Sequence, residues 1–332
     1  MQGKLHPRLL AKYIFKRVGF RDPDVLMGPS YGEDAAIIKV ENTKLIAVHA
    51  DPITGAVSNI GKLAVNIACN DIAVRGAVPR WLVFVLCLPP ENYESILNEI
   101  TLQVDEEAKK LKVMVVGGHT EVTEWLDRPF IVMTCIGTIR DRYITTDAAK
   151  PGEAVIAVKW AALEGTSILA SDYEDTLVKR GVSRETIQRA VKFIDYISVV
   201  KEALALSELP VSAMHDPTEG GVAAGLAEIA YASNVEIEVW EDKIPLRKET
   251  VKICNALNID PLKLISSGML IATIDKNLVE EAKSRMEKLG LNLSVIGEVK
   301  MGRGLIIHRA NGKTEKVGPY VRDELFRISE EL

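Results

Sequence analysis

The chain has 332 residues, of which 47% are apolar, and its formal net charge is −5. This apolar share excludes an intrinsically disordered chain, and the length favours two domains over a single core. An acidic balance without a basic block argues against a nucleic-acid partner, and the longest apolar runs reach only about half a membrane span. Because residues 1–10 lack the apolar centre of a signal peptide, we expect a cytoplasmic protein without a membrane segment.

The first 149 residues are predicted to form an α+β domain. In chain order, the apolar pattern predicts a helix at 5–18, strands at 35–40 and 44–51, a helix at 60–75, a strand at 80–90, a helix at 91–111, and strands at 113–118 and 130–139. This order implies helices on one face of a largely antiparallel sheet. Strands such as "WLVFVLCL" are apolar on both faces, so we expect a homodimer in which a partner subunit covers the second face.

A second domain is predicted to cover residues 150–332. Pro151 and Gly152 form a turn that opens a new strand, which places the boundary near residue 150. Strands are expected near 154–158, 235–239, 269–274 and 292–299, and helices near 165–172, 183–206, 221–233 and 277–289. Together these elements predict a second α/β layer structure.

Asp71 lies in the middle of the predicted helix at 60–75, with apolar residues on both flanks. A carboxylate in such surroundings is costly unless it is paired, hydrogen-bonded or bound to a metal ion. One interpretation is an ordinary helix ion pair with Arg75, four residues further on. The other is that Asp71 and its neighbour Asn70 belong to a cation or nucleotide site.

Three further polar clusters lie at the ends of predicted strands. They are Asp34 in "GEDAA", Asp51 in "HADPITG", and His119, Thr120 and Glu121 in "GGHTEV". Strand ends are where sheets place ligand sites, and oxygen ligands from separate segments suit a hard cation such as Mg²⁺. Each cluster also has a structural alternative, because Asp34 could close a turn, Asp51 could cap the next segment, and His119 could be a loop residue without a role.

The stretch "HDPTEGG" precedes another predicted helix. Asp216, Pro217 and Glu219 fit the N-cap, N1 and N3 positions of a helix. Capping does not require Gly220 and Gly221, which would let an anion approach the backbone N–H groups at the helix N-terminus. Close packing against another segment would also explain the two glycines.

Five motifs, "GEDAA", "ADPITG", "NDIAVRGAVP", "GGHTEV" and "HDPTEGG", occur in this order and resemble the aminoimidazole ribonucleotide synthetase superfamily. Its members include thiamine-monophosphate kinase, selenophosphate synthetase and the hydrogenase maturation factor HypE, and the chain looks most similar to HypE and HypE-like proteins. The resemblance spans nearly the whole chain. It implies a two-domain PurM-like fold and a homodimer of N-terminal sheets, with ATP and Mg²⁺ near the interface.

The resemblance also implies roles for particular residues. Asp34, Asp51 and Asp71 would hold Mg²⁺ and phosphate, which would compensate the buried charge of Asp71. The remaining cofactor positions would be Asn70, Gly117, Gly118, Thr120, Gly220 and Gly221, and the catalytic positions Asp216 and His119. A Walker A loop and a G-x-G-x-x-G turn are absent from the sequence, so ATP would bind through another architecture.

The chain departs from the HypE pattern at several positions. Where HypE carries "GDT-K", this chain has His119, Thr120 and Glu121, so one carboxylate and one lysine are missing. Ser267 stands in place of a glutamate, and Ser329 stands in place of the tail cysteine. We therefore expect an ATP- and Mg²⁺-dependent enzyme that transfers the γ-phosphoryl group to an oxygen of an acceptor, without cyanide formation on the tail. The alternative is a nucleotide-binding homodimer with little catalysis that acts as a partner in hydrogenase maturation.

Overall fold

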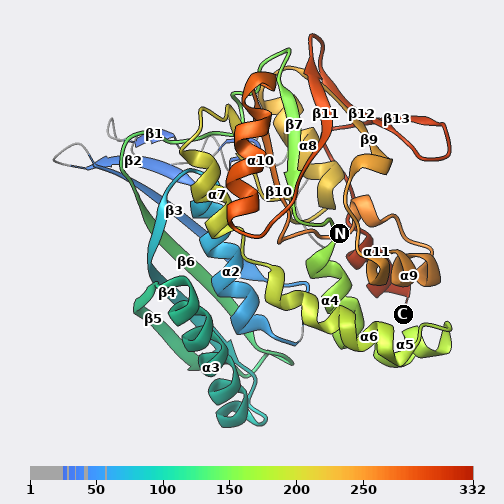
Figure 1. Cartoon of the computed structure of the whole chain (residues 1–332). Helices are drawn as coiled ribbons and strands as arrows, with labels where there is room; N and C mark the ends of the chain where they lie inside the picture. The colour runs from blue at the N-terminus through green and yellow to red at the C-terminus, as the bar shows by residue number, and fades with distance from the viewer. Residues whose placement is uncertain (1–24, 28–29, 34, 41–43, 57, 332) are drawn as a thin grey trace.

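The computed structural model describes residues 25–331 apart from 28–29, 34, 41–43 and 57 (Figure 1). The predicted helix at 5–18 and the candidate ligand Asp34 lie outside these residues. The described part of the chain contains two sheets, and each sheet has its own set of helices. Within the described residues, none of the helices is long and apolar enough to cross a bilayer.

The first sheet contains β1 (Val25–Met27), β2 (Ala36–Val40), β3 (Lys44–Ile53), β4 (Val78–Leu88), β5 (Met114–Val122) and β6 (Phe130–Ile139), in the order β1-β2-β3-β6-β4-β5. Helix α2 (Ile60–Ala73) packs across β3 and β6, and α3 (Tyr93–Leu111) packs across β4 and β5, on the same face (Figure 1). Only β4 and β5 are parallel neighbours. The predicted antiparallel character of the sheet and its one-sided helical cover are therefore confirmed.

Helix α2 is buried on nearly all sides, which explains why its sequence lacks a polar face. Every residue of the helix except Lys62 is buried. One side lies on the first sheet, where a Cβ atom at Gly137 would stand 2.3 Å from Cγ2 of Ile72. The helix also packs against α7 (Val200–Ser207) of the second half of the chain. Asp71 therefore lies in an interior formed by both halves.

The second sheet contains β7 (Ala154–Val158), β8 (Ala213–His215), β9 (Glu236–Trp240), β10 (Leu270–Ile274), β11 (Leu293–Lys300), β12 (Gly304–His308) and β13 (Thr314–Val317), in the order β13-β12-β9-β11-β7-β10-β8. Its α-helices besides α7 are α4 (Leu163–Asp172), α5 (Glu174–Lys179), α6 (Arg184–Val191), α8 (Gly221–Ala232), α9 (Lys248–Leu257), α10 (Val279–Lys288) and α11 (Glu324–Glu331). Short 3₁₀ turns are η2 (Lys192–Tyr196), η3 (Glu241–Lys243), η4 (Pro261–Lys263) and η5 (Lys276–Leu278). The sequence pattern predicted β7, β9, β10 and β11 but missed the short strands β8, β12 and β13.

One predicted helix and one predicted helix cap differ from the structure, whereas the helix predicted near 221–233 is found as α8. The helix predicted at 183–206 is divided into α6, η2 and α7, because residues 197–199 leave the helical path and bind a side chain of α2. The capping role predicted for Asp216 is wrong, because α8 begins only at Gly221. Its N-cap residue is Gly220, which has a left-handed φ of 78° that favours glycine.

Candidate functional site

His49, Asp51 and Asp71 come together where β3 faces α2, and we call these three residues the β3–α2 site. His49 and Asp51 are two positions apart on a strand, so their side chains project from the same face of the sheet. Metal-binding atoms of the three residues lie within 4.8 Å of one another. Nε2 of His49 is 3.1 Å from Oδ2 of Asp71, whose side chain is only 5% exposed. In the described part of the chain, no other group of three or more His, Cys, Asp or Glu residues meets this criterion.

The helix ion pair between Asp71 and Arg75 is not the arrangement found among the described residues. Arg75 is fully buried and donates from Nη1 to Oε2 of Glu33 at 2.8 Å. Its Nη2 donates to the backbone carbonyl of Met214 at 2.6 Å. Arg75 therefore connects the end of α2 to β8 of the second domain, and His49 faces Asp71 instead.

The β3–α2 site fits a divalent cation. An octahedral cation with bonds of about 2.1 Å holds its ligand atoms roughly 3–4 Å apart. The donor atoms of His49, Asp51 and Asp71 are already within 4.8 Å, so small side-chain rotations would bring them around one ion. Two carboxylates and one imidazole would leave positions for water or phosphate oxygens.

Asn70 is adjacent to Asp71 in the sequence but points to a different place. Its amide donates to the carbonyl of Ile197 at 3.0 Å, and its amide oxygen accepts from the N–H of Val199 at 2.8 Å. The side chain is fully buried. Asn70 thus links α2 to the second domain through two hydrogen bonds. These contacts give no support to its predicted role as a cofactor ligand.

The predicted nucleotide segment at 117–121 is part of the edge strand β5 rather than a loop. Strands β4 and β6 separate β5 from β3, and three steps of about 4.8 Å place the segment about 14 Å from the β3–α2 site. Gly117 and Thr120 are exposed, and the exposed His119 pairs with Glu121 at 3.2 Å. Within one chain, His119 and Thr120 therefore do not join the cation group.

Gly118 has a packing reason to be glycine. Its φ is 151°, and a Cβ atom there would stand 2.2 Å from the carbonyl oxygen of Phe84 on the neighbouring strand β4. Gly117 has no such constraint, because no atom would approach its Cβ within 4 Å. The two glycines of "GGHTEV" therefore differ, and only Gly117 offers open backbone.

Gly220 and Gly221 pack closely against other segments at the start of α8. A Cβ atom at Gly220 would stand 2.9 Å from the carbonyl oxygen of Val321, and one at Gly221 would stand 2.6 Å from that of Leu264. The N–H of Gly220 donates to Oδ2 of Asp323 at 2.5 Å. Packing thus accounts for both glycines, and an anionic ligand at Gly220 would have to replace Asp323.

Three carboxyl groups gather where α4, α8 and α11 begin. Glu164 lies in the first turn of α4, Glu219 precedes α8, and Asp323 precedes α11. Burial raises the pKa of Glu164 to about 8, Ser267 lowers it, and the charges of Asp323, Glu219 and Asp51 raise it further. The charge of Asp51 on β3 is among those that act on Glu164, so this carboxyl cluster lies within electrostatic range of the β3–α2 site.

Asp323 is the most constrained member of the carboxyl cluster. Burial raises its pKa to about 7, although backbone N–H groups of Gly220 and Leu325 donate to it and lower the value. Asp216, the other acidic candidate of this region, is fully buried after β8. The second domain therefore presents carboxyl groups of which some hold a proton near neutral pH.

Sequence reasoning missed three residues of this region. His49 carried a signal, because it stands two positions before Asp51 on a predicted strand and so had to share its face. Glu164 and Asp323 carried no signal in the sequence. The pKa of each carboxyl group is raised only because segments that are distant in the sequence bury it.

We expect the stability of the protein to fall as Glu164 ionises. A carboxyl group whose pKa is raised from 4.5 to about 8 keeps its proton in the folded chain after the unfolded chain has lost it, so stability decreases as pH rises through this window. Between pH 5 and pH 8, the free energy of unfolding of the wild type should fall by about 2 kcal/mol more than that of Glu164→Gln. One pKa unit corresponds to about 1.4 kcal/mol, and local relaxation offsets part of the shift.

Urea unfolding at both pH values measures this difference. The exposed Glu287→Gln serves as a matched control, because it removes a carboxylate that faces solvent. Parallel pH dependence of the wild type and Glu164→Gln would contradict the raised pKa.

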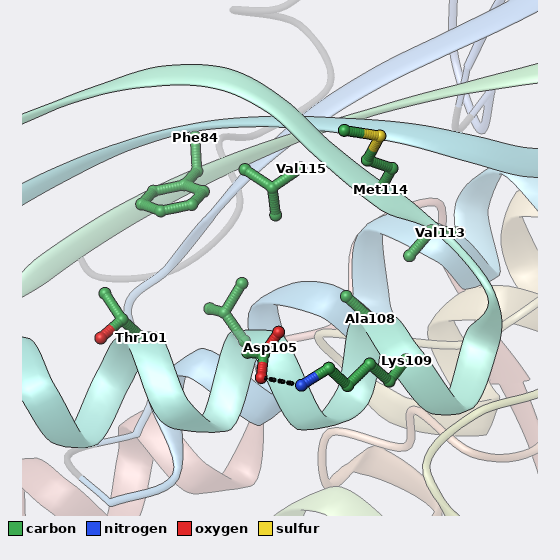
Figure 2. A pocket seen from close by; sticks show the side chains of 9 residues that line it. Phe84, Thr101, Asp105, Ala108, Lys109, Val113, Met114 and Val115 are labelled. Carbon is green, nitrogen blue, oxygen red and sulfur yellow. Dashed lines mark hydrogen bonds and ion pairs between the residues drawn. The ribbon is translucent and has the colours of Figure 1, made fainter.

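A separate apolar hollow of about 410 Å³ lies between α3 and the edge of the first sheet (Figure 2). Phe84 and Val115 project into it from the strands, and Thr101 and Ala108 from the helix. Its rim carries the ion pair between Lys109 and Asp105, at 2.5 Å. None of the predicted site residues lines this hollow, so the candidate site remains the β3–α2 site.

Family models match both halves of the chain. The AIR synthase related protein, N-terminal domain, matches residues 32–139, and the AIR synthase related protein, C-terminal domain, matches residues 150–309. The first match covers strands β2 to β6, and the second covers strands β7 to β12. Residues 140–149 fall between the matches, and the division between 149 and 150 stays a prediction.

Two named relatives and one solved structure extend over most of the chain. The thiamine-monophosphate kinase of Pyrococcus abyssi is 30% identical over 294 residues, which cover 84% of this chain and 86% of the kinase. A Methanocaldococcus jannaschii protein provisionally assigned to hydrogenase expression/formation is 29% identical over 323 residues, with coverage of 94% and 92%. A crystal structure of hydrogenase maturation protein HypE in complex with ATP matches with a TM-score of 0.72 and 23% identity, over 97% of this chain and 96% of that chain.

These comparisons agree with the architecture of the described residues, which is a two-domain α+β fold of the PurM-like type with two mixed sheets. The relatives by sequence are a kinase and a hydrogenase formation protein, and both are covered nearly in full. The chain belongs to the AIR synthase-related family of ATP-using enzymes and is HypE-like within it.

Proposed function

We propose that this protein transfers the γ-phosphoryl group of ATP to an oxygen atom of an acceptor and requires a divalent cation. The observation that carries the proposal is the β3–α2 site, where three metal-binding side chains converge in a chain of an ATP-using family. A kinase among the relatives and an ATP complex among the structural neighbours support the same reading. Asp51 and Asp71, together with Asp34, would hold Mg²⁺, which neutralises negative charge on the triphosphate when bound.

The carboxyl cluster of the second domain suits the acceptor side of this reaction. A general base works best when its pKa lies near the working pH, and Glu164 and Asp323 have pKa values of about 8 and about 7. On this proposal, the ionised form of Glu164 accepts the proton of the acceptor hydroxyl, and the buried Asp216 supports the same side of the site. The roles predicted for Gly220 and Gly221 would require Asp323 to leave the N–H of Gly220 first.

We also propose that the protein is a homodimer. The face of the first sheet opposite α2 and α3 presents Val48, Val85, Val132 and Ile136, which are exposed or half-buried. An apolar sheet face needs a cover to be stable in water, and a second copy of the sheet is a matching cover.

Light scattering tests the dimer. We expect a mass of twice 36.5 kDa at micromolar concentration. A charge at the centre of the interface should disrupt it, so Val85→Glu is expected to shift the protein toward 36.5 kDa. Val251→Glu is the matched control, because Val251 on α9 has the same exposure of 40% as Val85. A wild-type mass of 36.5 kDa would contradict the proposal.

We propose that Ser329, which stands where the resemblance places a cysteine, is not the phosphoryl acceptor. Ser329 lies within α11 and donates from Oγ to the carbonyl of Phe326 at 3.0 Å. Phe326 and Ile328 are buried and anchor this helix. A serine hydroxyl without an activating base is also a weak nucleophile. Incubation with γ-labelled ATP should therefore leave Ser329 unlabelled, and phosphate on this residue would reverse the assignment.

Single-turnover phosphate release from ATP tests the main proposal. We expect release to accelerate when a small-molecule cell extract is added, because the extract supplies the acceptor. The alternative is a nucleotide-binding homodimer with little catalysis that acts as a partner in hydrogenase maturation, which the name of the Methanocaldococcus jannaschii relative favours. Tight ATP binding with no release, with or without extract, would favour that alternative.

A further inference from the structure

We propose that His49 is a direct ligand of the cation, and that the β3–α2 site binds a transition divalent cation such as Mn²⁺ in preference to Mg²⁺. The inference rests on the proposed function and specifies the metal that this function uses. The sequence motifs pointed to aspartates alone, whereas the structure adds an imidazole to the same group.

The geometry supports coordination by His49 Nε2. This atom lies 3.1 Å from Oδ2 of Asp71, a separation typical of two neighbouring ligands around one cation. Asp51 projects from the same face of β3 and brings the third donor atom within 4.8 Å. The His49 side chain is 23% exposed and that of Asp71 is 5% exposed, so the imidazole stands between a buried carboxylate and the accessible side of the site.

The donor set determines which metal is favoured. Mg²⁺ prefers oxygen ligands and keeps most of its water, so an imidazole adds little to its affinity. Affinity for nitrogen ligands rises through the first transition series from Mn²⁺ to Cu²⁺, and imidazole suits these ions. One histidine with two aspartates should therefore shift the site from Mg²⁺ toward Mn²⁺ and later metals.

The competing interpretation is that His49 only pairs with Asp71. The two interpretations predict opposite effects of removing the imidazole. If His49 is a ligand, its loss weakens Mn²⁺ binding. If His49 is only a counter-charge, a cation must displace it, and its loss leaves Mn²⁺ binding unchanged or makes it stronger.

Electron paramagnetic resonance of the full-length protein with Mn²⁺ alone tests the inference. Pulsed measurements should detect nitrogen coupled to Mn²⁺ in the wild type, and ¹⁵N-histidine labelling should change the coupling frequency. His49→Gln should remove the coupling and weaken Mn²⁺ binding at least about tenfold, since even residues behind a metal ligand typically contribute that much. The affinity for Mg²⁺, measured by competition, should change by less than about threefold.

His308→Gln is the matched control, because His308 lies 3.5 Å from a single carboxylate, that of Glu238. It should retain the coupling and the affinity. Absence of nitrogen coupling in the wild type, or Mn²⁺ binding by His49→Gln that equals or exceeds the wild type, would overturn the inference. The wild-type spectrum decides the question even if the variant fails to fold.

Calorimetric titration with a non-hydrolysable ATP analogue separates this inference from the proposed function. Nitrogen-coupled Mn²⁺ without nucleotide binding would leave the His49 assignment intact and contradict the phosphoryl transfer. Nucleotide binding with Mg²⁺ and uncoupled Mn²⁺ would contradict the His49 assignment and leave the phosphoryl transfer intact.

Discussion

Asp71→Asn should lose cation-dependent ATP binding and keep its fold. Asparagine has nearly the same volume as aspartate, but its amide carries no charge to neutralise a cation. Because Asp71 supplies one of three converging donor atoms, we expect the affinity for a non-hydrolysable ATP analogue with Mg²⁺ to fall at least about 100-fold, which is about 2.7 kcal/mol. Calorimetric titration measures the affinity, and circular dichroism checks the fold.

Asp105→Asn is a matched control for this substitution. Asp105 forms a surface ion pair with Lys109 on α3, and its side chain is 55% exposed. The control should bind the ATP analogue as the wild type does. If Asp71 only formed an ion pair, Asp71→Asn would lose stability and retain its affinity for ATP, and that result would exclude the metal-binding role.

Arg75→Met should be the most destabilising substitution that we predict. The guanidinium is fully buried and pairs with Glu33, whose side chain is only 3% exposed. Removing one partner of a buried ion pair leaves an uncompensated charge and typically costs about 3–5 kcal/mol. Arg75→Met also removes the hydrogen bond to the carbonyl of Met214, which links α2 to β8 of the second domain. Urea denaturation measures the loss.

A double-mutant cycle with Glu33→Gln isolates the pair. Because the double variant removes both charges of the Arg75–Glu33 pair, we expect it to be more stable than Arg75→Met alone. Additive losses in the two single variants would show that Arg75 and Glu33 contribute independently. Such additivity would assign the stabilising effect of Arg75 to its other contacts, which include Thr146 and the carbonyl of Met214.

Local patterns in the sequence predicted the elements of the first sheet except the short edge strand β1. Runs rich in apolar residues predicted β3 and β6, and the largely apolar stretch from 60 to 75 predicted α2. The same run indicated that Asp71 needs compensation, because a helix with no polar face must be buried on several sides. The periodicity of apolar residues indicates which face of a segment is to be buried, and this pattern is contained in the segment itself.

The identity of the compensating group was decided by tertiary structure. Arg75 was the nearest candidate along the helix, but the second domain and Glu33 hold it elsewhere. His49 meets Asp71 because β3 lies under α2, which is a contact between distant segments. A local pattern does not show which distant segment will cover a given face. It therefore cannot decide whether Arg75 or His49 lies next to Asp71.

The same limit explains the two segments whose structure differs from their motif. The residues 119–122 looked like a loop after a strand, yet parallel pairing with β4 extends β5 through them. The sequence predicted that the backbone N–H of Gly220 would be open to an anion. This N–H group instead donates to Asp323, which lies about a hundred residues away in the sequence. Sequence by itself determined which residues carry charge and which faces are buried. The meeting of His49, Asp51 and Asp71 depended on the packing of a helix on a sheet, because hydrogen bonds and ion pairs form only between groups that the fold brings within a few ångströms.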